Sequence, residues 1–178
     1  IKEGTVEALR ADVKKNLERE VKFRVLARNK GAVMDALAKA AELEVPKALV
    51  QAESSQLADN ARRDLEMRGL KTKDIPVDPS WFTEQAERRV KLGLIMAELV
   101  KVNELHAKPE QIRALVEEMA QSYEDPSELV RWYYAQPERL AQAEAVVIED
   151  NVVEWVSAKA DTTDKDVAFD ELMGNNAA

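Results

Sequence analysis

The chain has 178 residues, which suit one domain or one elongated domain with two lobes. It contains no cysteine, which excludes disulfides and thiolate metal sites, and its net charge of −8 disfavours nucleic acid and anionic membranes as partners. No apolar run approaches the roughly 20 residues of a membrane span. Only 5 glycines and 5% aromatic residues, with abundant Ala, Glu, Leu and Lys, predict an all-α fold.

The first predicted helix covers about residues 5–42 and carries one apolar stripe. Its residues recur every three or four positions, as one helical face requires, and they are Val6, Leu9, Val13, Leu17, Val21 and Val25. A helix of this length would reach about 55 Å at 1.5 Å per residue. The protein should therefore be elongated, unless Gly31 breaks the helix.

Prolines mark the beginnings of the other predicted helices. A proline suits the first helical turn because its missing N–H would have no partner there. The five prolines in this position are Pro46, Pro79, Pro109, Pro126 and Pro137, and they predict helices at about 46–68, 79–103, 109–123, 126–135 and 137–159. Asp78 and Asp125 are expected N-caps, and Gly69 is the expected stop of the helix that begins at Pro46. The valine-rich segment 146–153 leaves a strand as an alternative within 137–159.

These helices divide the chain into a long first helix (about 1–45), two helical groups (about 46–106 and 107–160) and an acidic tail (161–178). The chain begins at Ile1 rather than Met, close to a helix start, so we interpret it as a piece of a longer protein. Helix 79–103 is apolar nearly all round, with Ile95, Met96 and Leu99 among its apolar residues. Other helices pack on this surface, or part of it faces a groove that is open to ligands.

Residue patterns that support catalysis are absent from the sequence. The one histidine, His106, has no partner at metal-ligand spacing, and no glycine-rich phosphate loop or nucleophile elbow occurs. We therefore expect no enzyme activity, cofactor or metal in this chain. The first helix is locally basic, which is compatible with nucleic-acid binding, but its cations are spread around the helix as on a solvated face.

An aromatic cluster is the most specific candidate for a binding site. Met119 and Tyr123 lie on one face of helix 109–123, and Leu129 and Trp132 lie on one face of the next helix. Trp132 and Tyr133 are followed by Tyr134, and three consecutive residues at steps of about 100° cannot all enter one core. Met and aromatic side chains at an open surface suit apolar binding that tolerates many sequences. A helix–helix core and a peptide-binding surface both remain open at this point.

The sequence resembles the C-terminal domain of trigger factor, the ribosome-associated bacterial chaperone. The segments that carry the resemblance are 5–20 (TVEALRADVKKNLERE), 44–49 (EVPKAL), 82–90 (FTEQAERRV), 92–94 (LGL), 103–105 (NEL), 117–126 (EEMAQSYEDP) and 168–173 (AFDELM). The resemblance implies an all-helical, ATP-independent, cytoplasmic chaperone domain, whose two arms form a cradle for unfolded or nascent chains. It also implies upstream ribosome-docking and prolyl isomerase domains, whose patterns this sequence does not contain, so the ribosome would be contacted only through a missing N-terminal domain.

The resemblance also implies which residues contact clients. The family's patch on the second arm matches Met119, Tyr123, Leu129 and Trp132, and Tyr133 lies beside it. Further candidate contacts are Trp81, Phe82, Ile95, Met96 and Leu99. A different class of function is a helical scaffold with one folded partner, or a homodimer, in which the apolar surface is a dedicated interface.

Overall fold

The computed structural model describes residues 5–70, 77–121, 123 and 125–174, and within these ranges it contains seven α-helices, one 3-10 helix and no strand. The elements are α1 (Val6–Ala40), α2 (Lys47–Met67), the 3-10 helix η2 (Pro79–Phe82), α3 (Thr83–Asn103), α4 (Pro109–Ala120), α5 (Pro126–Tyr134), α6 (Pro137–Lys159) and α7 (Phe169–Met173). The predicted all-α fold is confirmed. The strand alternative for the valine-rich segment is wrong, because α6 runs through it without interruption.

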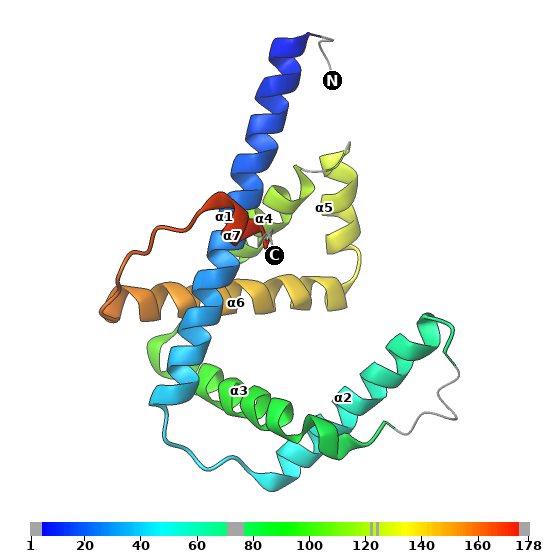
Figure 1. The fold of residues 1–178 in the computed structure, drawn as a ribbon, viewed down its shortest axis with the longest axis vertical. Helices are drawn as coiled ribbons and strands as arrows, with labels where there is room; N and C mark the ends of the chain where they lie inside the picture. Colours follow the sequence, from blue (N-terminus) through cyan, green and yellow to red (C-terminus); the bar gives the residue numbers. More distant parts are fainter. Residues whose placement is uncertain (1–4, 71–76, 122, 124, 175–178) are drawn as a thin grey trace.

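The long first helix is also confirmed. α1 has 35 residues, or about 52 Å at the helical rise, and it begins at Thr5, whose Oγ1 accepts a hydrogen bond from the N–H of Ala8 at 3.2 Å. The helix continues through Gly31, whose surroundings are solvent rather than packed atoms. Its N-terminal half projects beyond the other helices (Figure 1).

Three of the five prolines begin helices as predicted, and two differ. Pro109, Pro126 and Pro137 are the first residues of α4, α5 and α6. Pro46 is the N-cap of α2 rather than its first residue. Pro79 begins a 3-10 turn before α3, because the Trp81 N–H bonds to the carbonyl three residues back.

Predicted caps hold at both ends of the loop between α2 and α3. Gly69 follows α2 with a φ of +80°, a left-handed conformation that costs glycine nothing. Its N–H donates to Glu66 O at 2.9 Å, and the Leu70 N–H donates to Leu65 O at 3.0 Å, which together form a Schellman motif. Pro76, in the same loop, lies outside the described residues.

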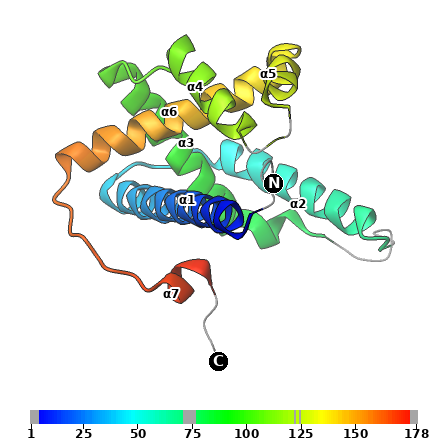
Figure 2. The ribbon, with the colours of Figure 1, turned by 90° about the horizontal axis from the view of Figure 1, so that it is seen from above.

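The helices form two groups on one long helix (Figures 1 and 2). α2, η2 and α3 form the first group, α4, α5 and α6 form the second, and α3 and α6 contact both each other and α1. α2 of the first group and α5 of the second lie on the same side of α1, whereas α6 crosses α1 and its C-terminal end lies on the other side (Figure 1). The sequence did not predict α7, which lies within the acidic tail. This helix contacts α1 on the face turned away from α4 and α6 (Figure 2).

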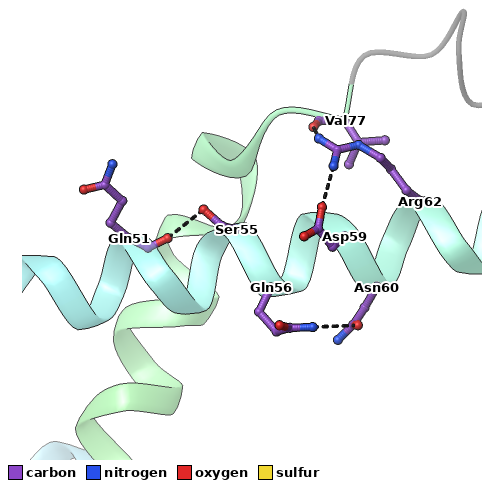
Figure 3. Close-up of polar contacts among 7 residues, drawn as sticks. All are labelled: Gln51, Ser55, Gln56, Asp59, Asn60, Arg62 and Val77. Atoms are coloured by element: carbon purple, nitrogen blue, oxygen red, sulfur yellow. Dashed lines mark hydrogen bonds and ion pairs between the residues drawn. The ribbon is translucent and has the colours of Figure 1, made fainter.

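Within the first group, small residues bring α2 and α3 close together. Ala58 of α2 and Ala86 of α3 are fully buried, and the hydroxyl of buried Ser54 has no hydrogen-bond partner. Arg62 ties α2 to the segment that precedes η2, because it donates to the Asp59 carboxylate at 2.5 Å and to the Val77 carbonyl at 2.9 Å (Figure 3). These contacts hold α2 against α3 and against the segment that precedes η2.

The apolar core is small for the amount of apolar surface in the chain. Val116 of α4 and Val152 of α6 are the largest side chains that are fully buried among the described residues. Many large apolar side chains are exposed instead, and every α-helix carries at least one, with the largest number on α1. Exposed apolar surface of this extent is typical of interaction surfaces.

Candidate apolar binding site on α4 and α5

A capped turn sets the position of α5 against α4. The Asp125 carboxylate accepts hydrogen bonds from the Ser127 hydroxyl at 2.6 Å, the Ser127 N–H at 3.0 Å and the Glu128 N–H at 3.2 Å. These hydrogen bonds lower the pKa of the Asp125 carboxyl below its ordinary value. The bond from the Ser127 hydroxyl has the largest effect, and the bond from the Glu128 N–H has the second largest. Pro126 is the first residue of α5, so the chain reverses sharply and places the two helices side by side.

An open groove of about 440 Å³ lies at this turn. Its lining residues are Tyr123, Asp125, Glu128, Leu129 and Trp132. Tyr123 is 59% exposed and Trp132 is 49% exposed, whereas Leu129 is half-buried. The groove therefore offers two aromatic side chains and a leucine for apolar contact, with two carboxylates at its edge.

Neighbouring side chains hold Trp132 in one orientation. Its ring meets that of Tyr133 edge to face at 5.2 Å and 81°. The Arg139 guanidinium lies 3.5 Å from the centre of the Trp132 ring and also donates to the Trp132 carbonyl at 2.7 Å. The Tyr133 hydroxyl reaches the Met119 sulfur at 3.9 Å, which links α5 to α4. These contacts fix the ring before any ligand binds, which would lower the entropy cost of binding.

The three consecutive aromatic residues separate as predicted. Tyr133 is half-buried against its neighbours, while Trp132 and Tyr134 are 49% and 47% exposed. Only Trp132 of these three lines the groove. The cluster thus serves both helix packing and an open surface.

The candidate residues divide into two sets. Met119, Tyr123, Leu129, Trp132 and Tyr133 gather on α4 and α5. The other candidates lie in the first group, where Ile95, Met96 and Leu99 are half-buried on α3, Phe82 is half-buried in η2, and Trp81 is largely exposed. None of this second set lines the α4–α5 groove.

Sequence reasoning missed two features of the binding surfaces. Arg139, which stacks on Trp132, lies in the first turn of the next helix, and no sequence pattern connects the two residues. The spacing of apolar residues predicted a stripe along α1, but it did not predict that the stripe is exposed. In the structure Leu9, Val13 and Leu17 are all exposed. Spacing identifies an apolar face, whereas exposure depends on which helices reach it.

Several basic residues of α1, from Lys22 onward, pair with other helices. Lys22 pairs with Glu118 of α4 at 2.5 Å, and Lys30 pairs with Asp150 of α6 at 2.8 Å and with Glu149 at 3.2 Å. Partial burial alone would lower the pKa of Lys30, but the hydrogen bonds and charges of Asp150 and Glu149 outweigh it and raise the pKa. These cations join α1 to its neighbours, which does not favour nucleic-acid binding by this helix.

The one histidine of the chain lies at the surface. His106 is exposed, and its backbone carbonyl accepts from the side-chain amide of Asn151 at 3.3 Å. Across the part of the chain that the structure describes, no three His, Cys, Asp or Glu side chains are placed to hold a metal ion. The helices in that part also include none long and apolar enough to cross a bilayer.

Comparison with known proteins gives one consistent match. The family model of the bacterial trigger factor C-terminus matches residues 5–158. The chain is 71% identical over 177 residues to the trigger factor of Azoarcus sp. (strain BH72) and 69% identical to that of Aromatoleum aromaticum, in each case over 99% of this chain. The trigger factor of Herminiimonas arsenicoxydans is 58% identical over the same share. The chain spans about 40% of the length of these relatives.

Proposed function

We propose that this chain, which belongs to the trigger factor family and corresponds to the C-terminal domain of that family, binds exposed apolar segments of unfolded or nascent proteins and delays their aggregation. Binding needs no nucleotide, because burial of apolar surface supplies the free energy. Release follows from weak affinity and fast dissociation. The matched part is the C-terminal domain and not the isomerase domain, so this chain acts by binding alone.

The open groove formed by α5 and the turn that joins it to α4 is the observation that carries this proposal. Tyr123 and Trp132 present large aromatic surfaces, and Met119 adds a flexible, polarisable side chain beside them. Such side chains bury apolar groups of many shapes, because apolar burial has little directional preference. Asp125 and Glu128 at the edge favour apolar segments that also carry Lys or Arg.

The two helical groups act as arms in this proposal. α2 of the first group and α5 of the second lie on the same side of α1, and each group presents an exposed tryptophan, Trp81 in the first and Trp132 in the second. A client that reaches both arms gains affinity through effective concentration, although each contact is weak. In the full-length protein, ribosome docking and prolyl isomerisation would belong to other domains, and the setting would be the cytoplasm.

Suppression of aggregation tests the proposal directly. A chemically denatured enzyme is diluted into buffer with increasing amounts of the chain, and light scattering is recorded. We expect scattering to fall as the chain reaches molar excess, and we expect the variant Tyr123→Ser/Trp132→Ser to protect less. Unchanged scattering at a large excess of the chain would refute the proposal.

Titration with several unrelated unfolded clients separates a chaperone from a scaffold or homodimer. A chaperone should show amide shifts in the α4–α5 groove with each client. A dedicated interface should respond to one partner with a fixed stoichiometry, and one substitution should abolish binding. Response to a single folded partner only, or to a second copy of the chain only, would replace the chaperone assignment with the scaffold.

A further inference from the structure

The N-terminal half of α1 carries an apolar stripe that no neighbouring helix covers. Leu9, Val13 and Leu17 are each exposed to a similar degree, with Val13 at 48%. In the described chain α1 packs against α3, α6 and α7, and its first turns extend past all three (Figure 1). The stripe is therefore a surface rather than part of a core.

Side chains along this stripe form a shallow groove with a basic edge. The groove measures about 580 Å³, and it is lined by Leu9, Arg10, Val13, Lys14, Leu17, Glu18 and Val21. Lys14 lies 3.8 Å from Glu18, and both side chains are largely exposed, so this ion pair contributes little and is easily exchanged. Arg10 and Lys14 can thus bond to acidic groups of a bound segment.

Further along, α1 already binds a segment of the same chain. α7 contacts α1, and its Glu171 pairs with Arg28 at 3.0 Å. Leu172 and Met173 of α7 are half-buried. This short helix has the sequence Phe-Asp-Glu-Leu-Met, so the segment that α1 binds combines bulky apolar side chains with carboxylates.

The open groove and the α7 contact lie along one face of α1. Arg28 follows Val21 by seven residues, and positions seven apart share a helical face. Val21, which lines the groove, is half-buried, whereas Leu17 and Val13 before it are exposed. The groove therefore continues toward the α7 contact, with apolar residues along it and cations beside it.

We propose that the groove on the N-terminal half of α1 is a second client-binding surface, which takes short amphipathic segments that combine bulky apolar side chains with Asp or Glu. α7 shows the chemistry of such a segment at the C-terminal end of the same face. This inference rests on the proposed chaperone function and adds a location and a client class to it. The charge preference is opposite to that of the α4–α5 groove, whose edge is acidic.

A peptide with the sequence of residues 166–174 (DVAFDELMG) is the probe. It is titrated into the isotopically labelled full chain, and amide shifts are followed residue by residue. We expect shifts centred on Leu9, Val13 and Leu17. A peptide in which Lys replaces each Asp and Glu should bind about three- to fivefold more weakly, as expected for the loss of exposed charge pairs.

Substitutions in the groove test its location. Val13→Gln/Leu17→Gln keeps good helix formers at exposed positions, so α1 should stay folded, and circular dichroism checks this. This variant should bind the peptide about tenfold more weakly, since two apolar contacts are lost. Val102→Gln, which changes an exposed apolar residue of α3 that lines neither groove, should bind it unchanged and is the matched control.

Several outcomes would overturn the inference. One is a set of shifts confined to the α4–α5 groove or to the α7 contact, and another is equal affinity of the acidic and Lys-substituted peptides. A third is full peptide affinity in the Val13→Gln/Leu17→Gln variant. None of these affects the chaperone proposal, which is tested separately by the suppression of aggregation by the unsubstituted chain.

Discussion

Replacing Trp132 by alanine should weaken client binding about tenfold without abolishing it. A tryptophan side chain has a surface of roughly 250 Å², and at 49% exposure about half of it is available to a client. Complete burial of that half at about 25 cal/mol per Å² would contribute about 3 kcal/mol. A client that covers half of the available area loses about 1.5 kcal/mol on truncation, which is close to a tenfold change in Kd.

Binding of a fluorescently labelled unfolded client, measured by anisotropy, checks this value. Tyr134→Ala is the matched control, because Tyr134 is an adjacent aromatic residue with nearly equal exposure, 47%, that does not line the groove. We expect the control to bind within twofold of the parent chain. Equal losses in both variants would refute the groove as the contact, and complete loss in Trp132→Ala would indicate one dedicated hot spot instead of several weak contacts.

Three further predictions concern stability, each checked by thermal unfolding or by circular dichroism. Gly31→Ala should stabilise α1 by about 0.5–1 kcal/mol, because the site is helical and open, whereas Gly69→Ala should destabilise by about 1 kcal/mol, because its φ is +80°. The opposite sign for either would contradict the backbone argument. Ser54→Ala should stabilise by about 1 kcal/mol, since it removes a buried hydroxyl without a partner, and a loss of stability would indicate a hydrogen bond at that hydroxyl. The Ser127 hydroxyl lowers the pKa of Asp125 in the folded protein below the ordinary carboxyl pKa of 3.8. The ionised cap should therefore stabilise α5 at every pH above 3.8, and the stabilisation should be lost as the pH falls through the lowered pKa of the folded state. In the Asp125→Asn variant this part of the acid transition should disappear.

Much of the fold could be predicted because its signals are local. Three kinds of residue act within one turn of their own positions: a proline that lacks an N–H, an aspartate that can cap and a glycine that can adopt positive φ. The residues Pro137, Asp125 and Gly69 are examples, and each behaves as expected. The 3-10 turn at Pro79 was missed, because the choice between bonds to the third and the fourth residue back depends on how η2 packs against α2. α7 was missed because five residues cannot form a stable helix alone, and its contact with α1 is long-range.

The candidate site could be predicted in composition but not in exposure. The three consecutive aromatics of α5 required at least one to lie outside a core, and the structure leaves Trp132 and Tyr134 open. Sequence spacing could not separate these two residues by role, because the turn at Asp125 sets the orientation of α5 and so decides which of them lines the groove. The α1 stripe shows the same limit, since its period is that of any buried helix face.

The opposite charges at the edges of the two grooves have a consequence for client range. Asp125 and Glu128 repel acidic segments from the α4–α5 groove, while Arg10 and Lys14 attract them to α1. Unfolded chains mix both kinds of segment, so one client can occupy both surfaces at once, and each contact raises the effective concentration of the other. Added salt weakens the charge selection at both edges but leaves apolar burial intact. A rise in salt should therefore reduce the discrimination between acidic and basic peptides more than it reduces the affinity for a long unfolded client, whereas a single uniform surface would lose both in parallel.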